Sequence, residues 1–401
     1  MTLATAEAAA LAHLAQLPML DWVKRWSAVN SGTGNLAGVA AVGEMLAAGF
    51  GALPGTLAMV EPDPVERVTP AGVVETVAHG RHLHLTVRPD APVQMLFTGH
   101  MDTVYPADHP FQALTMLGDG RLNGPGVADM KGGLACLLAA LTAVEASPAA
   151  ARLGYEVVIN SDEEVGSFSS AALLARAARG KVAALTYEPA LPDGTLAGAR
   201  GGTGNFSLVV RGRSAHAGRN PEDGRNAIVA AADLAMRLKK ATGPKLSVNP
   251  ARIDGGGPNN VVPDLAVLRV NFRPGGPDEI ARAQAQLDAA VAMVGAEHEV
   301  AVEVHGSFNR PPKPLDAGAE RLFALVKEAG GELGLDIGWR ATGGVCDGNN
   351  IAAAGVPVVD TMGARGGAIH SADEFLIPES LPERAGLSVV TIMRIAERGR
   401  A

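Results

Sequence analysis

Histidine and carboxylate side chains follow apolar segments of the chain, each within a short polar or glycine-rich stretch. His100 follows VQMLFT, Asp129 lies in GPGVADMKGG, Glu164 lies in SDEE after YEVVIN, Glu188 follows VAALTY, and His370 lies in GARGGAIHSADE. Imidazoles and carboxylates are donors suited to zinc, with cobalt or manganese as substitutes. These ligands are too many for one open catalytic zinc but suit two ions if one carboxylate bridges them. The residues therefore predict a two-zinc site.

Two further carboxylates stand beside these ligands. Asp102 lies two positions after His100, where it can accept the second N–H of that imidazole and fix its tautomer. Glu163 directly precedes Glu164, and adjacent side chains on a strand or loop point in different directions. One glutamate can therefore bind metal while the other takes a proton from the attacking water. This makes Glu163 the candidate base.

The apolar segments are expected to be strands of one sheet. Strands predicted at 93–98, 154–160 and 182–187 alternate with helices at 130–145 and 167–178. This order is typical of an α/β fold with a doubly wound, mostly parallel sheet that helices cover on both faces. Because the carboxyl ends of parallel strands lie at one edge of a sheet, such a fold would bring the polar residues together.

The pattern changes after residue 200 to that of a smaller α+β domain. The proline-rich segment RPPKP at 310–314 follows it as an expected linker, and the α/β pattern then returns. We therefore predict a catalytic domain in two parts, 1–200 and 312–401, with an inserted domain over 201–311. The elements expected here are strands at 206–212, 262–272, 299–304 and 356–360, and helices at 223–240, 278–294 and 316–334.

Length and composition narrow the class of protein. A chain of 401 residues favours two domains, and a net charge of −8 argues against nucleic acid as a partner. Cys136 and Cys346 are the only cysteines, so a disulfide framework is excluded. The first twenty residues resemble an amphipathic helix rather than a signal peptide, and no apolar run is long enough to span a membrane. We expect a cytoplasmic protein.

Other polar or glycine-rich positions carry weaker signals. His82 and His84 alternate with apolar residues, so they are expected to face solvent on a half-buried strand and to have no function. The glycines at 124–126 and 198–205 lack the spacing of nucleotide-binding loops. Cys346 has no histidine partner in the sequence pattern, which favours an ordinary loop thiol over a nucleophile.

The motifs GHMDTV (99–104), GPGVADMKGG (124–133) and SDEEVGS (161–167), followed by Glu188 and His370, occur in a recognisable order. Together they closely resemble the zinc metallopeptidase family that includes glutamate carboxypeptidase (the carboxypeptidase G type), acetylornithine deacetylase and succinyl-diaminopimelate desuccinylase. The resemblance covers nearly the whole chain, including the inserted domain.

This resemblance implies a role for each residue of the site. Asp129 bridges the two zinc ions, and the peptide bond that follows it is cis. Glu163 is the general base, and Asp102 orients His100. The other ligands divide into two pairs, His100 with Glu188 and Glu164 with His370.

The resemblance also assigns roles within the inserted domain. The segment GRSAHAGRNPEDGRNAI (212–228) resembles a lid motif in which His216 stabilises the oxyanion, usually in the active site of a partner subunit. Asn260 and Arg273 resemble residues that hold a free carboxylate of the substrate, a task that suits the planar guanidinium. A homodimer that forms through the inserted domain is therefore expected.

Several activities fit the resemblance. The leading hypothesis is a di-zinc hydrolase that releases a C-terminal amino acid, glutamate above all, from an N-acyl or peptidyl substrate. An N-acyl amino acid deacylase is the nearest alternative. A dipeptidase or aminopeptidase is less favoured because relatives with glutamate at the position of Glu188 tend to be carboxypeptidases or deacylases. A non-catalytic binding protein would lack a ligand or the base. The loop 341–350, which contains Cys346, resembles a substrate-contacting loop and leaves the acyl group open.

Overall fold

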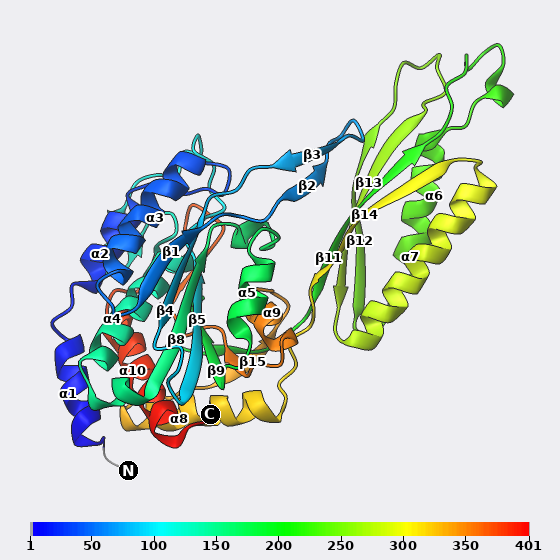
Figure 1. Cartoon of the computed structure of the whole chain (residues 1–401). Helices are drawn as coiled ribbons and strands as arrows, with labels where there is room; N and C mark the ends of the chain where they lie inside the picture. Colours follow the sequence, from blue (N-terminus) through cyan, green and yellow to red (C-terminus); the bar gives the residue numbers. More distant parts are fainter. Residues whose placement is uncertain (1–2, 401) are drawn as a thin grey trace.

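The computed structural model describes residues 3–400. Figure 1 shows a larger lobe built around one twisted sheet and a smaller, elongated lobe that projects from it. The two lobes have separate hydrophobic cores.

The central sheet of the larger lobe has six strands in the order β1-β4-β8-β5-β9-β16. The strands from β8 to β16 run parallel, whereas β4 pairs antiparallel with β8 and β1 pairs antiparallel with β4. The predicted mostly parallel α/β sheet is therefore confirmed. The strand bounds are β1 Thr56–Val60, β4 His82–Val87, β5 Val93–His100, β8 Leu153–Asn160, β9 Ala183–Thr186 and β16 Val358–Val359.

Alternating side chains of these strands contribute to two different layers. Met95 and Phe97 of β5 belong to the main core with α3, α4 and α10, whereas Leu96 belongs to a second cluster with α5 and α9. A strand buried on both faces needs apolar residues at most positions, as β5 and β9 have. The helix bounds are α1 Thr5–Leu14, α2 Met19–Ser27, α3 Leu36–Phe50, α4 Gly133–Glu145, α5 Ala171–Ala178, α8 Ala317–Glu332, α9 Asp347–Ala353 and α10 Ser380–Arg398.

Helix α4 follows the kinked segment η1 (Val127–Gly132), in which Asp129 and Met130 have non-helical backbone angles, and the two together form a long apolar stretch. Among the described residues, Val127–Glu145 alone is long and apolar enough to cross a membrane, and 94% of its 18-residue window is buried within the lobe. It packs against α1, α2 and α10. Burial in the protein core therefore accounts for its apolar composition.

The expectation that His82 faces solvent is wrong. Strand β4 lies inside the sheet, between β1 and β8, and residues Ser161 and Ser169, which follow β8, cover its face at His82. The His82 ring is fully buried, with Nε2 3.2 Å from the Ser169 carbonyl oxygen and Nδ1 3.3 Å from the Ser161 backbone nitrogen. Of these two histidines, only His84 is partly exposed, and its Nε2 lies 2.7 Å from Glu156 Oε2.

Short strands complete the larger lobe. The pair β10 (Leu196–Arg200) and β15 (Trp339–Thr342) is parallel. A small antiparallel sheet has the order β17-β18-β7-β6. Its strands are β6 Thr115–Met116, β7 Leu122–Asn123, β17 Gly366–Gly367 and β18 Phe375–Leu376.

The smaller lobe is a four-stranded antiparallel sheet, β12-β13-β11-β14, with α6 and α7 on one face. On the other face lies the hairpin β2–β3, which reaches out from the larger lobe and buries Val68 against Val209 and Val267. The sequence did not predict β12. The bounds are β2 Val65–Val68, β3 Val74–Val77, β11 Thr203–Arg211, α6 Ala227–Lys240, β12 Leu246–Gly255, β13 Leu265–Pro274, α7 Pro277–Glu297 and β14 Ala301–Arg310.

Candidate active site

The carboxyl ends of the parallel strands carry the predicted metal ligands. His100 is the last residue of β5, Glu188 lies two residues after β9, and Glu164 lies in a short 3-10 helix (Glu163–Val165) just after β8. Asp129 lies in η1, before α4, and His370 lies in the loop between β17 and β18. The structure therefore brings together side chains that are up to 270 positions apart in the sequence.

Asp129 lies between the two histidines. Its Oδ1 is 3.1 Å from His100 Nε2, and its Oδ2 is 3.2 Å from His370 Nε2. Each histidine also faces a second carboxylate, since Glu188 Oε2 is 3.8 Å from His100 Nε2 and Glu164 Oε2 is 3.3 Å from His370 Nε2. One carboxylate with an oxygen toward each imidazole is the arrangement that a bridging ligand needs. The peptide bond between Asp129 and Met130 is cis.

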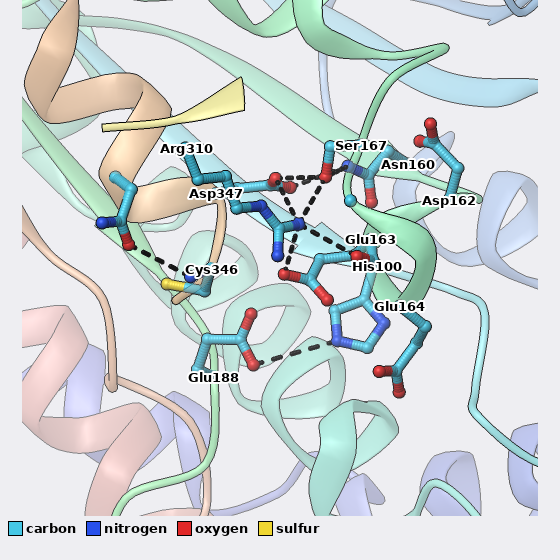
Figure 2. Close-up of polar contacts among 12 residues, drawn as sticks. His100, Asn160, Asp162, Glu163, Glu164, Ser167, Glu188, Arg310, Cys346 and Asp347 are labelled. Atoms are coloured by element: carbon cyan, nitrogen blue, oxygen red, sulfur yellow. Dashed lines mark hydrogen bonds and ion pairs between the residues drawn. The ribbon is translucent and has the colours of Figure 1, made fainter. Parts of the chain in front are cut away.

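The neighbouring glutamates do point to different partners. Glu164 faces His370, whereas the Glu163 carboxylate lies 2.7 Å from Arg310 Nη2. Glu163 nevertheless lies close to the ligands, because its oxygen, a His100 nitrogen and a Glu188 oxygen are all within 4.8 Å of one another (Figure 2). Glu163 therefore lies within reach of a group bound by these ligands.

Asp102 is buried and holds more than one neighbour. His100 Nδ1 is 3.0 Å from the Asp102 backbone oxygen and 3.4 Å from its carboxylate Oδ1. The same carboxylate accepts hydrogen bonds from the backbone N–H groups of Glu163 and Glu164, both at 3.2 Å, and from the Thr33 hydroxyl at 2.7 Å. Asp102 thus fixes the loop that presents both glutamates as well as the imidazole.

The charge of this cluster fits metal ions. Its four carboxylates, those of Asp129, Glu163, Glu164 and Glu188, are largely buried. Burial raises the pKa of Glu163 to about 7 against the opposing charge of Arg310, and burial with the nearby Asp129 charge raises the pKa of Glu164 to about 8. So much buried negative charge is unfavourable by itself, and divalent cations would balance it. The donor set and its charge therefore suit metal binding.

A cavity of about 540 Å³ opens beside the cluster. Its lining includes candidate metal ligands, the loop from Ala341 to Cys346, and Arg200 and Arg340. Its volume is that of a site for a small molecule. Cys346 is buried at the start of α9, and burial raises the pKa of its thiol well above the ordinary value. Such a thiol is a poor nucleophile.

The predicted residues of the smaller lobe do not meet the cluster within one chain. His216 is exposed and pairs with Val261, and the Ala217 N–H donates to the Asn260 carbonyl. These residues lie beyond the Arg211 end of β11, whereas the chain enters from the larger lobe at the Thr203 end. Arg273 is also exposed but lies near the other end of the sheet, where β13 faces the start of β11. About eight residues of strand separate the two ends, or roughly 25 Å at ~3.3 Å per residue.

Sequence reasoning missed several buried residues that support the site. Glu374 accepts hydrogen bonds from the backbone N–H groups of Gly126, Ala128 and Asp129, at 3.0 to 3.1 Å, and so holds the loop that carries Asp129. Its place four positions after His370, in HSADE, is a signal that the sequence offered. Arg310 gave no such signal, because it is a single arginine at the start of an apparent linker.

Comparison with known proteins agrees with this geometry. Residues 96–394 match the family described as Peptidase family M20/M25/M40. The chain is 30% identical over 373 residues to carboxypeptidase G2 of Pseudomonas sp. (strain RS-16), covering 91% of this chain and 86% of that protein. It is 28% identical to succinyl-diaminopimelate desuccinylase of Verminephrobacter eiseniae (strain EF01-2), covering 71% of this chain and 74% of the relative.

Among solved structures, the fold resembles that of the Bacillus subtilis YXEP protein, described as a dinuclear metal binding peptidase from the M20 family. The TM-score is 0.66 at 15% identity, over 96% of this chain and 99% of the other. The predicted family is therefore confirmed. The chain belongs to peptidase family M20/M25/M40 and is a metallo-hydrolase that acts on amide or peptide bonds.

Proposed function

We propose that this enzyme uses two zinc ions to release a C-terminal amino acid, glutamate above all, from an N-acyl or peptidyl substrate. The position of Asp129 supports two ions best, since each of its oxygens faces a different histidine. The 30% identity to carboxypeptidase G2 supports the carboxypeptidase activity. Identity to a desuccinylase favours an N-acyl amino acid deacylase as the second candidate, with the same metals.

Different residues of the chain would act in different steps of the hydrolysis. Bound metal ions would supply the positive charge that acidifies the attacking water and polarises the amide carbonyl. Glu163 would accept the proton of that water and pass it to the leaving nitrogen. His216 would donate a hydrogen bond to the developing oxyanion. Arg273 and Asn260 would anchor the free carboxylate, and this would hold the scissile bond in place.

A substrate screen tests the carboxypeptidase proposal. We expect the zinc-loaded enzyme to cleave N-acyl-glutamate and peptides that end in glutamate, and to be poor on the same compounds with an amidated carboxyl end. Arg273→Ala should raise KM strongly on the acids, because the guanidinium pairs with both carboxylate oxygens. Arg252→Ala removes another exposed arginine of the smaller lobe as a control. Equal rates on acid and amide would contradict carboxyl-end specificity, and preference for acetylornithine would favour the deacylase.

We further propose a cytoplasmic homodimer in which the smaller lobe, residues 201–311, acts as lid and dimerisation domain. His216 and Asn260 lie roughly 25 Å along the sheet from Arg273. One chain therefore cannot bring all three to one substrate, whereas a second chain can supply the histidine and the asparagine. This geometry supports an active site shared between subunits.

Mixing two inactive variants tests the shared site. His216→Ala and Glu163→Gln are each expected to be nearly inactive. In a mixed dimer, one site lacks both groups and the other keeps both. Subunit exchange should therefore restore about a quarter of wild-type activity at equal, random pairing, since half of the dimers hold one intact site of two. If subunits exchange, as a labelled tag would report, and activity stays at the sum of the two variants, the histidine acts within its own chain or not at all.

A further inference from the structure

Two chain segments connect the lobes, and they lie side by side. Arg200 and Lys313 exchange backbone hydrogen bonds at 2.9 and 3.0 Å, and Thr203 pairs with Arg310. The buried side-chain amide of Asn349, in α9, donates to the carbonyl of Gly201 at 2.9 Å and to that of Pro311 at 2.7 Å. Residues 200–203 and 310–313 therefore form one tied connection, which we call the hinge.

Arg310, the last residue of β14, extends its guanidinium from the hinge into the larger lobe (Figure 2). Its Nη2 lies 2.7 Å from Glu163 Oε1 and donates to the Glu163 backbone carbonyl at 2.9 Å. The same nitrogen donates to the Ser167 hydroxyl oxygen at 2.8 Å. One group of the smaller lobe thus contacts both the main chain and the carboxylate of the proposed base.

Asp347 holds this arginine from the opposite side. Its Oδ1 is 3.5 Å from Arg310 Nη2 and accepts the Ser167 hydroxyl at 2.5 Å, while its Oδ2 accepts the Asn160 amide at 2.7 Å. The Arg310 side chain is 6% exposed and that of Asp347 is 2% exposed. A buried charge that loses its partner is strongly unfavourable. The carboxylates of Asp347 and Glu163 therefore hold the guanidinium between them.

We infer that Arg310 is a positioning residue, which fixes the Glu163 carboxylate and makes its placement depend on the hinge. An ion pair fixes the direction of the carboxylate, and a misplacement of about 1 Å at a reacting group can cost about 10²-fold in rate. The inference rests on the proposed role of Glu163 and adds to it a residue from the connection between the lobes.

The competing role for Arg310 is to bind the substrate carboxylate, because its Nε has no hydrogen-bond partner among residues 3–400. The two roles predict different kinetics. A substrate anchor mainly affects KM, whereas a positioning residue mainly affects kcat. Lys313 offers a matched control, since it is another buried hinge cation, but its Nζ pairs with Asp360 at 3.0 Å and not with Glu163.

The experiment is a double-mutant cycle on the zinc-loaded enzyme. Arg310→Met alone should lower kcat about 10²-fold, with KM changed by less than about threefold. In a Glu163→Gln background it should lower kcat by less than about threefold, since the group that it positions is already lost. Lys313→Met should lower kcat by the same factor in both backgrounds. Metal content and melting temperature are measured for every variant.

If Arg310→Met does not fold, the double-mutant cycle is repeated with Arg310→Lys and with Asp347→Asn in its place. Arg310→Lys should recover part of kcat, because an ammonium can still contact the carboxylate. A rise in KM with unchanged kcat would overturn the inference, and so would equal factors in both backgrounds while Glu163→Gln itself is nearly inactive. Full activity of Glu163→Gln would instead remove the base assignment, and the inference with it.

Discussion

Glu163→Gln should lower kcat by about 10²–10⁴-fold, the usual contribution of general-base catalysis, while two metal ions remain bound. The amide keeps the size of the carboxylate but cannot accept a proton. Glu163 lies 2.7 Å from Arg310, close to His100 and Glu188, so it is well placed to act on the attacking water. Steady-state kinetics and elemental analysis of the same samples measure the two effects.

Glu156→Gln provides the control for this change. Glu156 is a partly buried glutamate of β8, the same strand that leads to Glu163, but its partners are His84 and Lys181. Its replacement should leave kcat near the wild-type value. If Glu163→Gln keeps most of its activity, another group must serve as base.

Asp129→Ala should remove both metal ions and nearly all activity, because Asp129 faces both histidines. His100→Ala should mainly weaken the ion shared with Glu188, and His370→Ala the ion shared with Glu164. The number of metal ions that each variant loses distinguishes a bridging ligand from a ligand of one ion. Inductively coupled plasma mass spectrometry after dialysis counts the ions in each variant. Fully active wild-type enzyme with a single ion would contradict the bridged arrangement.

The candidate metal ligands at the strand ends could be predicted from the sequence, because each of them follows a local pattern of apolar residues. His100, Glu164 and Glu188 each follow an apolar run, and parallel topology then brings them to one edge. The support around them depends on contacts between distant parts of the chain, which no local pattern contains. Arg310 is 147 positions from Glu163, and its neighbouring prolines suggested only a linker.

The errors in secondary structure have equally specific causes. Alternation predicted an exposed His82 because it assumes that one face of a strand meets solvent, whereas Ser161 and Ser169 cover that face at His82. Strand β12 was missed because Pro250 and several polar residues interrupt its pattern; it lies at an edge of its sheet, where proline is tolerated. The roles of His216, Asn260 and Arg273 stay predictions, because a single chain does not bring them together.

The order in which the chain is synthesised differs from the order in which the larger lobe can be completed. Its sheet is made before residue 187 except for β16, yet α10, which packs on α4 and α1, comes last, at Ser380–Arg398. Until that helix leaves the ribosome, the apolar surface of α4 lacks its cover. The smaller lobe is one uninterrupted stretch, Thr203–Arg310, so it can fold while its host is still incomplete. The inserted lobe is thus free to be the first folded unit of the nascent chain.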